Sequence, residues 1–220
     1  MNKLFPQSFL HPVPYIFAME AVIGINFNDF SLIAADTHAV FSIIFVKNDV
    51  DKIYTLSDNL LMGVIGEAGD TAQFAEFISK NIQLFKIRNG FELSPKCAAL
   101  FIQRNMADYL RSRTPYHCNL VLAGFDKEKG PQMFYIDYLA TLAELPYVVH
   151  GYPMMFTLGL LDKDYRPDMT EEEAIKLMTD CIYEINTRFV GSLKNYVVKK
   201  LDANGVKRLP DICVTKPKNS

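Results

Sequence analysis

The chain has 220 residues, of which 50% are hydrophobic and 22% are charged, and its formal net charge is −2. This length suits one domain with a sizeable core, and the high apolar content excludes a disordered chain. The 23 basic and 25 acidic residues are spread along the sequence, so no basic patch indicates a nucleic-acid partner.

Residues 1–18 are predicted to form an irregular N-terminal extension, because Pro6, Pro12 and Pro14 interrupt them ahead of any regular pattern. The same prolines break the continuous apolar core that a signal peptide needs. The uncharged stretch 145–161 contains Pro146 and Pro153, which argue against a membrane-spanning helix. We therefore expect no membrane partner. Residues 19–220, which follow the extension, are predicted to form a single domain.

Short apolar runs that flank turn residues predict strands in three parts of the chain. The predicted strands cover residues 21–25, 30–34, 52–55, 60–65, 119–125, 132–137 and 196–201. The turns between neighbouring strands are rich in Asn, Asp and Gly, which is typical of β-hairpins.

Runs with apolar residues on one face predict four helices. The first is expected to begin at an Asp70–Gln73 capping box and to end at Gly90, and the second to begin at Ser94-Pro95. A third covers residues 154–161, and a fourth begins at a Thr170–Glu173 capping box. The order is strands, two helices, strands, two helices, strands. This order predicts an α+β domain with helices packed outside two sheets.

The composition and motifs exclude several kinds of catalytic site. The sequence contains no G-x-S-x-G, HExxH or P-loop pattern. The four cysteines are too widely spaced for a zinc site, so no metal and no cofactor are expected, and reduced thiols are the simplest interpretation. They are Cys97, Cys118, Cys181 and Cys213.

The histidines give little support for a catalytic site. His117 and Cys118 are adjacent, but neighbouring side chains on a strand point to opposite faces, which argues against a Cys–His nucleophile. His38 is expected to be exposed. His150 lies between apolar segments and is expected to be a satisfied core or interface residue.

Four motifs occur in a characteristic order. They are AADTH at residues 34–38, DKIY at 51–54, GVIGEAGD at 63–70 and SRTPY at 112–116. Together they resemble the beta-type subunits of the 20S proteasome core, and the resemblance runs from about Glu20 to near the C-terminus. Within that family, the longer segments around these motifs are most similar to the type-2 class, which occupies the non-catalytic beta-4 position. The resemblance implies a four-layer αββα sandwich of the N-terminal nucleophile hydrolase type.

The resemblance also assigns positions to a catalytic site. In active members the first residue of the mature chain is a threonine, whose hydroxyl attacks the peptide carbonyl with help from its own free α-amine. In this chain Glu20 falls at that position, and no Gly-Thr processing junction occurs anywhere in the sequence. Asp36 and Lys52 fall where active members place the residues that organise the nucleophile. Gly66 falls where a backbone N–H stabilises the oxyanion.

These retained positions also have structural interpretations. Asp36 and Lys52 are expected to form a partly buried ion pair, and Gly66 a tight strand-to-helix turn. Active members carry a Gly-Ser-Gly-Ser run where this chain has Gly-Tyr-Pro-Met at residues 151–154, and an aspartate where it has Phe189; Ser192 matches a family serine. No catalytic residue is therefore expected: Asp36, Lys52 and Gly66 outline a vestigial site.

The resemblance predicts a non-catalytic beta subunit of the 20S core particle. It would complete the beta ring and the proteolytic chamber used in ATP- and ubiquitin-dependent protein degradation, in the cytoplasm and nucleus. Its partners would be other beta subunits, the alpha ring and the opposite beta ring. One alternative is an active N-terminal threonine hydrolase subunit of a proteasome-like ring. A weaker alternative is a free-standing binding protein on the same fold.

Overall fold

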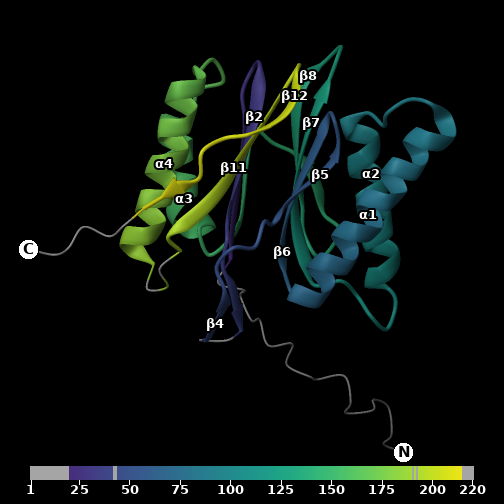
Figure 1. Ribbon diagram of the computed structural model, residues 1–220, viewed down its shortest axis with the longest axis horizontal. Coiled ribbons are helices and arrows are strands. Elements are labelled where there is room, and N and C mark those ends of the chain that lie inside the picture. Colours follow the sequence, from purple (N-terminus) through teal and green to yellow (C-terminus); the bar gives the residue numbers. More distant parts are fainter. Residues whose placement is uncertain (1–19, 42–43, 190, 192, 215–220) are drawn as a thin grey trace, which may run out of the picture.

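The computed structural model describes residues 20–41, 44–189, 191 and 193–214. Within these residues, two antiparallel sheets stack face to face, and a pair of helices covers the outer surface of each sheet (Figure 1). The layers run from α3 and α4, through the sheet that contains β2 and β11, to the sheet that contains β5–β8, and then to α1 and α2. This is the four-layer αββα sandwich of the N-terminal nucleophile hydrolase type, as predicted.

The first sheet has the strand order β10-β1-β2-β11-β12, and β13 also pairs with β11. Its strands are β1 (Ala21–Asn26), β2 (Phe30–Asp36), β10 (Tyr147–Gly151), β11 (Asn195–Asp202), β12 (Gly205–Arg208) and β13 (Ile212–Cys213). The hairpin predicted between the first two strands is confirmed, with β1 antiparallel to β2. The strand predicted at 196–201 is β11, which is antiparallel to β12.

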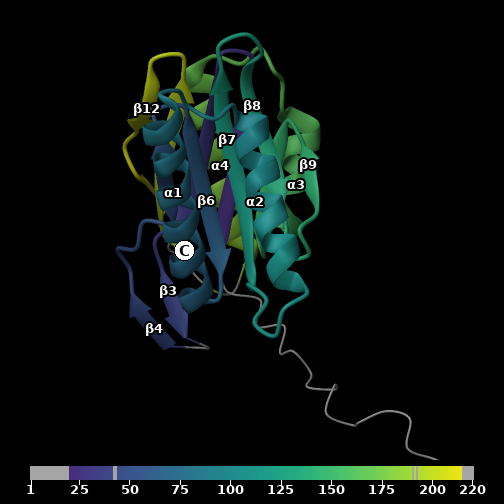
Figure 2. The same ribbon diagram turned by 90° about the vertical axis from the view of Figure 1, so that its right-hand side faces the viewer.

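The second sheet has the strand order β5-β6-β7-β8-β9. Its strands are β5 (Ile53–Ser57), β6 (Leu60–Gly66), β7 (Cys118–Asp126), β8 (Gly130–Ile136) and β9 (Leu142–Glu144). A separate hairpin of β3 (Ala39–Phe41) and β4 (Ile44–Lys47) follows β2 and extends beyond one end of the sandwich (Figure 2). The strands β3, β4, β9, β10 and β13 were not predicted, and each of them is five residues or shorter.

The helices are α1 (Ala68–Asn89), α2 (Pro95–Leu110), α3 (Met154–Asp164) and α4 (Glu171–Arg188). Three of the predicted helix ends are confirmed. Thr170 and Glu173 form the reciprocal capping box of α4, Ser94 caps α2, and Gly90 ends α1 in the left-handed conformation with φ 76°.

The capping box predicted at Asp70 is wrong. Helix α1 begins at Ala68. Its N-cap is Glu67, three residues before Asp70, and Glu67 makes no side-chain cap hydrogen bond. The Asp70 carboxylate lies in the first turn and accepts a hydrogen bond from the His117 backbone N–H at 2.9 Å instead. A long-range partner therefore replaces the local one that the sequence pattern indicated.

The core follows the alternation of side chains along each strand. Ile23 of β1 packs toward α3 and α4, whereas its neighbour Val22 packs between the two sheets. Met62 of β6 likewise packs toward α1 and α2, and Leu61 packs between the sheets. Every strand near the centre of the sandwich is therefore covered on both faces, which fixes its register and positions its ends.

The predicted extension at residues 1–18 lies outside the described residues, as does Ser192. In the part of the chain that the structure describes, none of the helices is both long and apolar enough to cross a bilayer.

Candidate functional site

Four residues that the sequence singled out meet at one end of the sandwich. Glu20 immediately precedes β1, Asp36 ends β2, Lys52 precedes β5 and Gly66 ends β6. The first two belong to one sheet and the last two to the other. Asp36 is fully buried and Lys52 is 6% exposed. The structure therefore brings together charged groups from both sheets in a site that is largely closed to water.

The Asp36 carboxylate has a partner on every side. The Lys52 ammonium lies 3.0 Å from each carboxylate oxygen. The backbone N–H of Ala21 donates to Oδ1 at 2.7 Å, and that of His38 donates to Oδ2 at 3.0 Å. The predicted ion pair forms, but it is fully rather than partly buried. Hydrogen bonds to both oxygens offset the cost of removing the charge from water.

The two backbone donors were not predicted from the sequence. The His38 contact has a recognisable pattern, since an aspartate commonly accepts a hydrogen bond from the N–H two residues later. The Ala21 contact depends on the β1–β2 pairing and has no local pattern. The side chain of His38 is itself buried, with only 6% of the residue exposed. The prediction that His38 is exposed is therefore wrong.

The Glu20 side chain occupies the remaining donors of the site. Its Oε1 lies 2.9 Å from the Lys52 ammonium, and its Oε2 accepts a hydrogen bond from the Gly66 N–H at 2.9 Å. Two carboxylates thus share one ammonium. Burial raises the pKa of Glu20, and the charge of Asp36 adds to this, while Lys52 and the Gly66 N–H oppose it.

Gly66 is required by the local geometry. Its φ of 143° lies in a region that side chains disfavour, and a Cβ at this position would lie 2.2 Å from the His117 carbonyl oxygen. The absence of a side chain lets β6 turn into α1 with the Gly66 N–H directed at Glu20. The predicted tight turn is confirmed, and the same N–H is the one to which the sequence resemblance assigned the oxyanion.

Tyr152 and Phe189 lie where the resemblance assigns a serine and an aspartate to active members, and Pro153 lies where it assigns a glycine. The Tyr152 and Phe189 rings stack with centroids 5.1 Å apart. Pro153 precedes α3, and its carbonyl oxygen accepts a hydrogen bond from the Thr157 hydroxyl at 2.9 Å. Gly151 has a φ of 87°, and a Cβ there would lie 2.1 Å from the Glu20 carbonyl oxygen. On this side of the site the Gly151 backbone therefore lies directly against the Glu20 backbone.

The remaining candidates form no second reactive centre. His117 is exposed and Cys118 is buried, and burial raises the pKa of the Cys118 thiol to about 12. His150 is confirmed as a satisfied core residue, because its Nε2 lies 3.0 Å from the Leu120 carbonyl oxygen and its ring stacks on Tyr135. Burial lowers the pKa of His150 to about 4, so the ring is neutral at pH 7.

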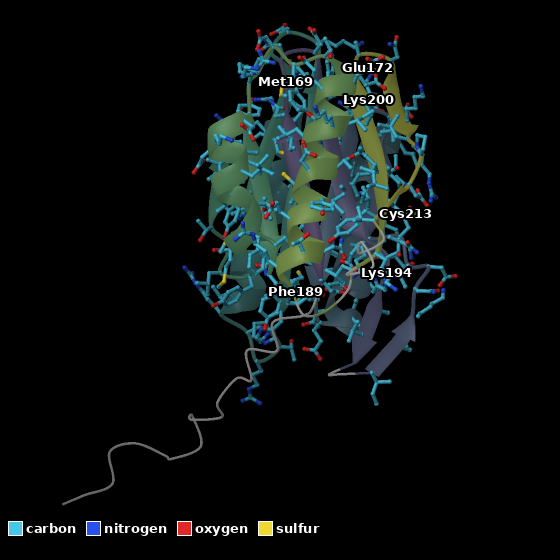
Figure 3. The ribbon with its side chains drawn as sticks, turned by 90° about the vertical axis from the view of Figure 1, so that its left-hand side faces the viewer. Met169, Glu172, Phe189, Lys194, Lys200 and Cys213 are labelled. Carbon is cyan, nitrogen blue, oxygen red and sulfur yellow. The ribbon has the colours of Figure 1, made fainter. Side chains whose placement is uncertain are left out.

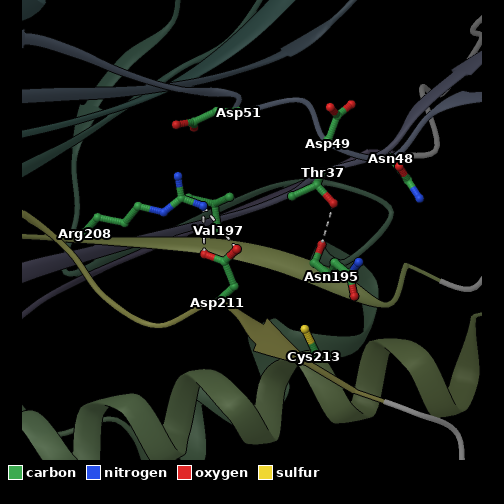
Figure 4. A pocket seen from close by; sticks show the side chains of 9 residues that line it. All are labelled: Thr37, Asn48, Asp49, Asp51, Asn195, Val197, Arg208, Asp211 and Cys213. Atoms are coloured by element: carbon green, nitrogen blue, oxygen red, sulfur yellow. Dashed lines mark hydrogen bonds and ion pairs between the residues drawn. The ribbon is translucent and has the colours of Figure 1, made fainter.

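A cavity of about 210 Å³ lies near the start of β11, apart from the Glu20 cluster (Figure 4). Its charged side chains already have partners. Arg208 pairs with Asp211 at 3.0 Å, and Asp51 pairs with Lys199 at 2.7 Å. Within the described ranges, no group of three or more His, Cys, Asp or Glu side chains is placed to hold a metal ion.

The buried carboxylate of Glu20 predicts a specific pH dependence. Its pKa is raised above the ordinary 4.5, so the folded chain binds this proton more tightly than the unfolded chain. Stability contributed by Glu20 is therefore lost as the pH rises from 4.5 through the raised pKa. We expect the free energy of unfolding of the native chain, minus that of Glu20→Gln, to fall over this window and to be constant above it.

Urea unfolding of both chains at a series of pH values measures this difference. Glu172→Gln is the matched control, because Glu172 is exposed on the first turn of α4 (Figure 3). A difference between the native chain and Glu20→Gln that increases with pH, or that does not change, would contradict the prediction.

The comparison with protein families gives one match, to the family described as "Proteasome subunit", over residues 19–201. The chain is 42% identical over 194 residues to "Proteasome subunit beta type-4" of Saccharomyces cerevisiae, which covers 88% of this chain and 98% of that protein. It is 44% identical over 189 residues to "Proteasome subunit beta type-2-B" of Arabidopsis thaliana, covering 86% and 94%. It is 42% identical over 195 residues to "Proteasome subunit beta type-2" of Dictyostelium discoideum, covering 87% and 98%.

Proposed function

This chain belongs to the proteasome family, as a beta-type subunit of the 20S core, and from that premise we propose that it is a non-catalytic subunit. Its role is structural: it completes the beta ring and the wall of the proteolytic chamber. The observation that carries the proposal is the contact of the Glu20 carboxylate with both Lys52 and the Gly66 N–H. The sequence resemblance assigns position 20 to the nucleophile of active members.

The Glu20 contacts occupy the groups that peptide cleavage would require. An N-terminal threonine hydrolase needs a lysine and an aspartate to organise its nucleophile and a free N–H to stabilise the oxyanion. Here the ammonium of Lys52 is shared between two carboxylates, and the Gly66 N–H donates to one of them. Glu20 itself has no hydroxyl, and the sequence offers no Gly-Thr junction for processing.

The structural role accounts for the exposed apolar side chains of the isolated chain. Ile87 and Phe91 are exposed at the end of α1, and Ile44 and Val46 are exposed on the projecting hairpin. In an obligate assembly, apolar surface of this kind is covered by neighbouring subunits. In this proposal the partners are other beta subunits, the alpha ring and the opposite beta ring. The assembly acts in ATP- and ubiquitin-dependent protein degradation in the cytoplasm and nucleus.

Covalent labelling of the native particle tests the proposal. A covalent inhibitor directed at N-terminal threonines is added to the particle, and each subunit is then analysed by intact mass. We expect adducts on the catalytic subunits, which serve as the positive control, and none on this chain. An adduct on this chain, or a mature chain that begins with Thr, Ser or Cys, would establish the alternative of an active hydrolase subunit.

Restoring a threonine at one position is expected not to restore activity. A Glu20→Thr chain released with residue 20 at its N-terminus would have the hydroxyl and the α-amine. It would still carry Phe189 where active members have an aspartate, Met154 where they have a serine and Pro153 where they have a glycine. We expect its rate of peptide cleavage to equal that of a Glu20→Ala chain released in the same way. Cleavage of a fluorogenic peptide above that control would overturn the prediction.

A further inference from the structure

Apolar side chains gather at the beginning of α3, beside the Glu20 cluster. Met154 is 41% exposed and Met155 is 72% exposed. Tyr152 precedes Met154 by two residues in the chain, and its half-buried ring stacks on that of Phe189, which lies at the end of α4 (Figure 3). We call these four residues the α3 patch. Adjacent exposed apolar side chains of this size are typical of a surface that another segment covers.

The pairing of β1 with β10 places the start of β1 beside the α3 patch. In the β1–β10 pairing, Val22 lies opposite His150 and Ala21 lies opposite Gly151. The close approach of Gly151 to the Glu20 carbonyl oxygen shows that this contact continues to Glu20. Tyr152 is the next residue along. The residues before Glu20 therefore begin beside the α3 patch.

The segment that precedes Glu20 is apolar and nearly uncharged, which suits a segment that packs on an apolar surface. Residues 15–19 read Tyr-Ile-Phe-Ala-Met, an unbroken apolar run, and Lys3 is the only charged residue among residues 1–19. An extended chain advances about 3.4 Å per residue, so five residues span about 17 Å. This reach exceeds the pitch of about 5.4 Å of one helical turn, and the first turn of α3 holds both exposed methionines.

We propose that residues 15–19 fold back onto the α3 patch of the same chain. Glu20 fixes the root of this segment, because its side chain is held by Lys52 and by the Gly66 N–H. Fixing one end lowers the entropy that the rest of the segment loses on docking. Met154 and Met155 suit such a contact, since unbranched methionine side chains adapt to the shape of an apolar partner.

Methionine oxidation in the native particle tests this proposal. Peroxide converts accessible methionines to sulfoxides, so we expect oxidation of Met154 and Met155 about fivefold faster in a Tyr15→Ser, Ile16→Ser, Phe17→Ser chain than in the native chain. Half-buried Met169 lies at the far end of the same face, as Figure 3 shows, and its rate should not change. A Leu4→Ser, Phe5→Ser chain is the matched control and should resemble the native chain.

Equal oxidation rates of Met154 and Met155 in all three chains would overturn the proposal. This result would mean that the patch is exposed in every chain, or that another subunit covers it in every chain. A second measurement, photo-crosslinking, remains possible even if the triple-serine variant does not assemble into the particle. A photo-crosslinking phenylalanine analogue at position 17 is expected to attach to the α3 patch within one chain, giving a product with the mass of a single subunit. Attachment to another subunit, or to no residue of the patch, would overturn the proposal.

Discussion

A Lys52→Met chain is expected to be about 3–5 kcal/mol less stable than the native chain, because the substitution removes one member of a buried charged cluster. The ammonium of Lys52 lies within 3.0 Å of both Asp36 oxygens and 2.9 Å from Glu20. Methionine retains most of the side-chain volume, so the loss is electrostatic. The two buried carboxylates would lose the ammonium that they share. Urea unfolding followed by circular dichroism measures the change.

Two further variants separate this effect from general damage. Lys86→Met removes a lysine whose partners Asp58 and Glu92 lie on the surface, and it should leave the urea midpoint nearly unchanged. Adding Glu20→Gln to Lys52→Met removes one of the two uncompensated charges and should recover part of the lost stability. If the Lys52→Met chain has the same urea midpoint as the native chain, the cluster does not contribute to the free energy of unfolding, and the prediction is wrong.

A Gly66→Ala chain is expected to lose about 3 kcal/mol or more, because the new methyl group would meet backbone atoms that cannot move independently. The added Cβ would lie 2.2 Å from the His117 carbonyl oxygen and 2.8 Å from the Cys118 Cα, and the φ of 143° is strained for alanine. Relief of the clash would shift β6 against β7 and break the hydrogen bond to Glu20. Thermal unfolding measures the loss.

Gly69→Ala is the matched control for this prediction. Gly69 lies three residues later, in the first turn of α1, and a Cβ there would meet no atom within 4 Å. Because alanine is the better helix former, this change should stabilise the chain by about 0.5 kcal/mol. The two alanine variants should therefore shift the melting temperature in opposite directions. Equal melting temperatures would contradict the account of Gly66.

The order of the elements could be predicted because it depends on local patterns. The Thr170–Glu173 capping box and the glycine at the end of α1 act through neighbouring residues, and both are confirmed. Strand β10 was missed because its five residues, 147–151, form a short and mostly apolar run without alternation of polar and apolar side chains. Asp70 was misassigned because its partner, His117, is 47 residues away.

The sequence was sufficient to predict which residues form the site. It was not sufficient to predict all the contacts that those residues make with one another. The Asp36–Lys52 pair was predicted from the resemblance, and the pair forms. The contact of Glu20 with both Lys52 and Gly66 could not be predicted, because it depends on how the ends of β1, β5 and β6 meet in space. The Tyr152–Phe189 stack is likewise set by the packing of α3 against α4.

The position of the Glu20 cluster has a consequence for how the chain comes apart. Glu20 and Asp36 belong to one sheet, whereas Lys52 and Gly66 belong to the other, so the ion pairs and the Gly66 hydrogen bond cross the interface between the sheets. They form only after both sheets exist and have docked in register, and they must break before the sheets can separate. These four residues therefore resist separation of the two sheets, and they are expected to lengthen the lifetime of the folded chain.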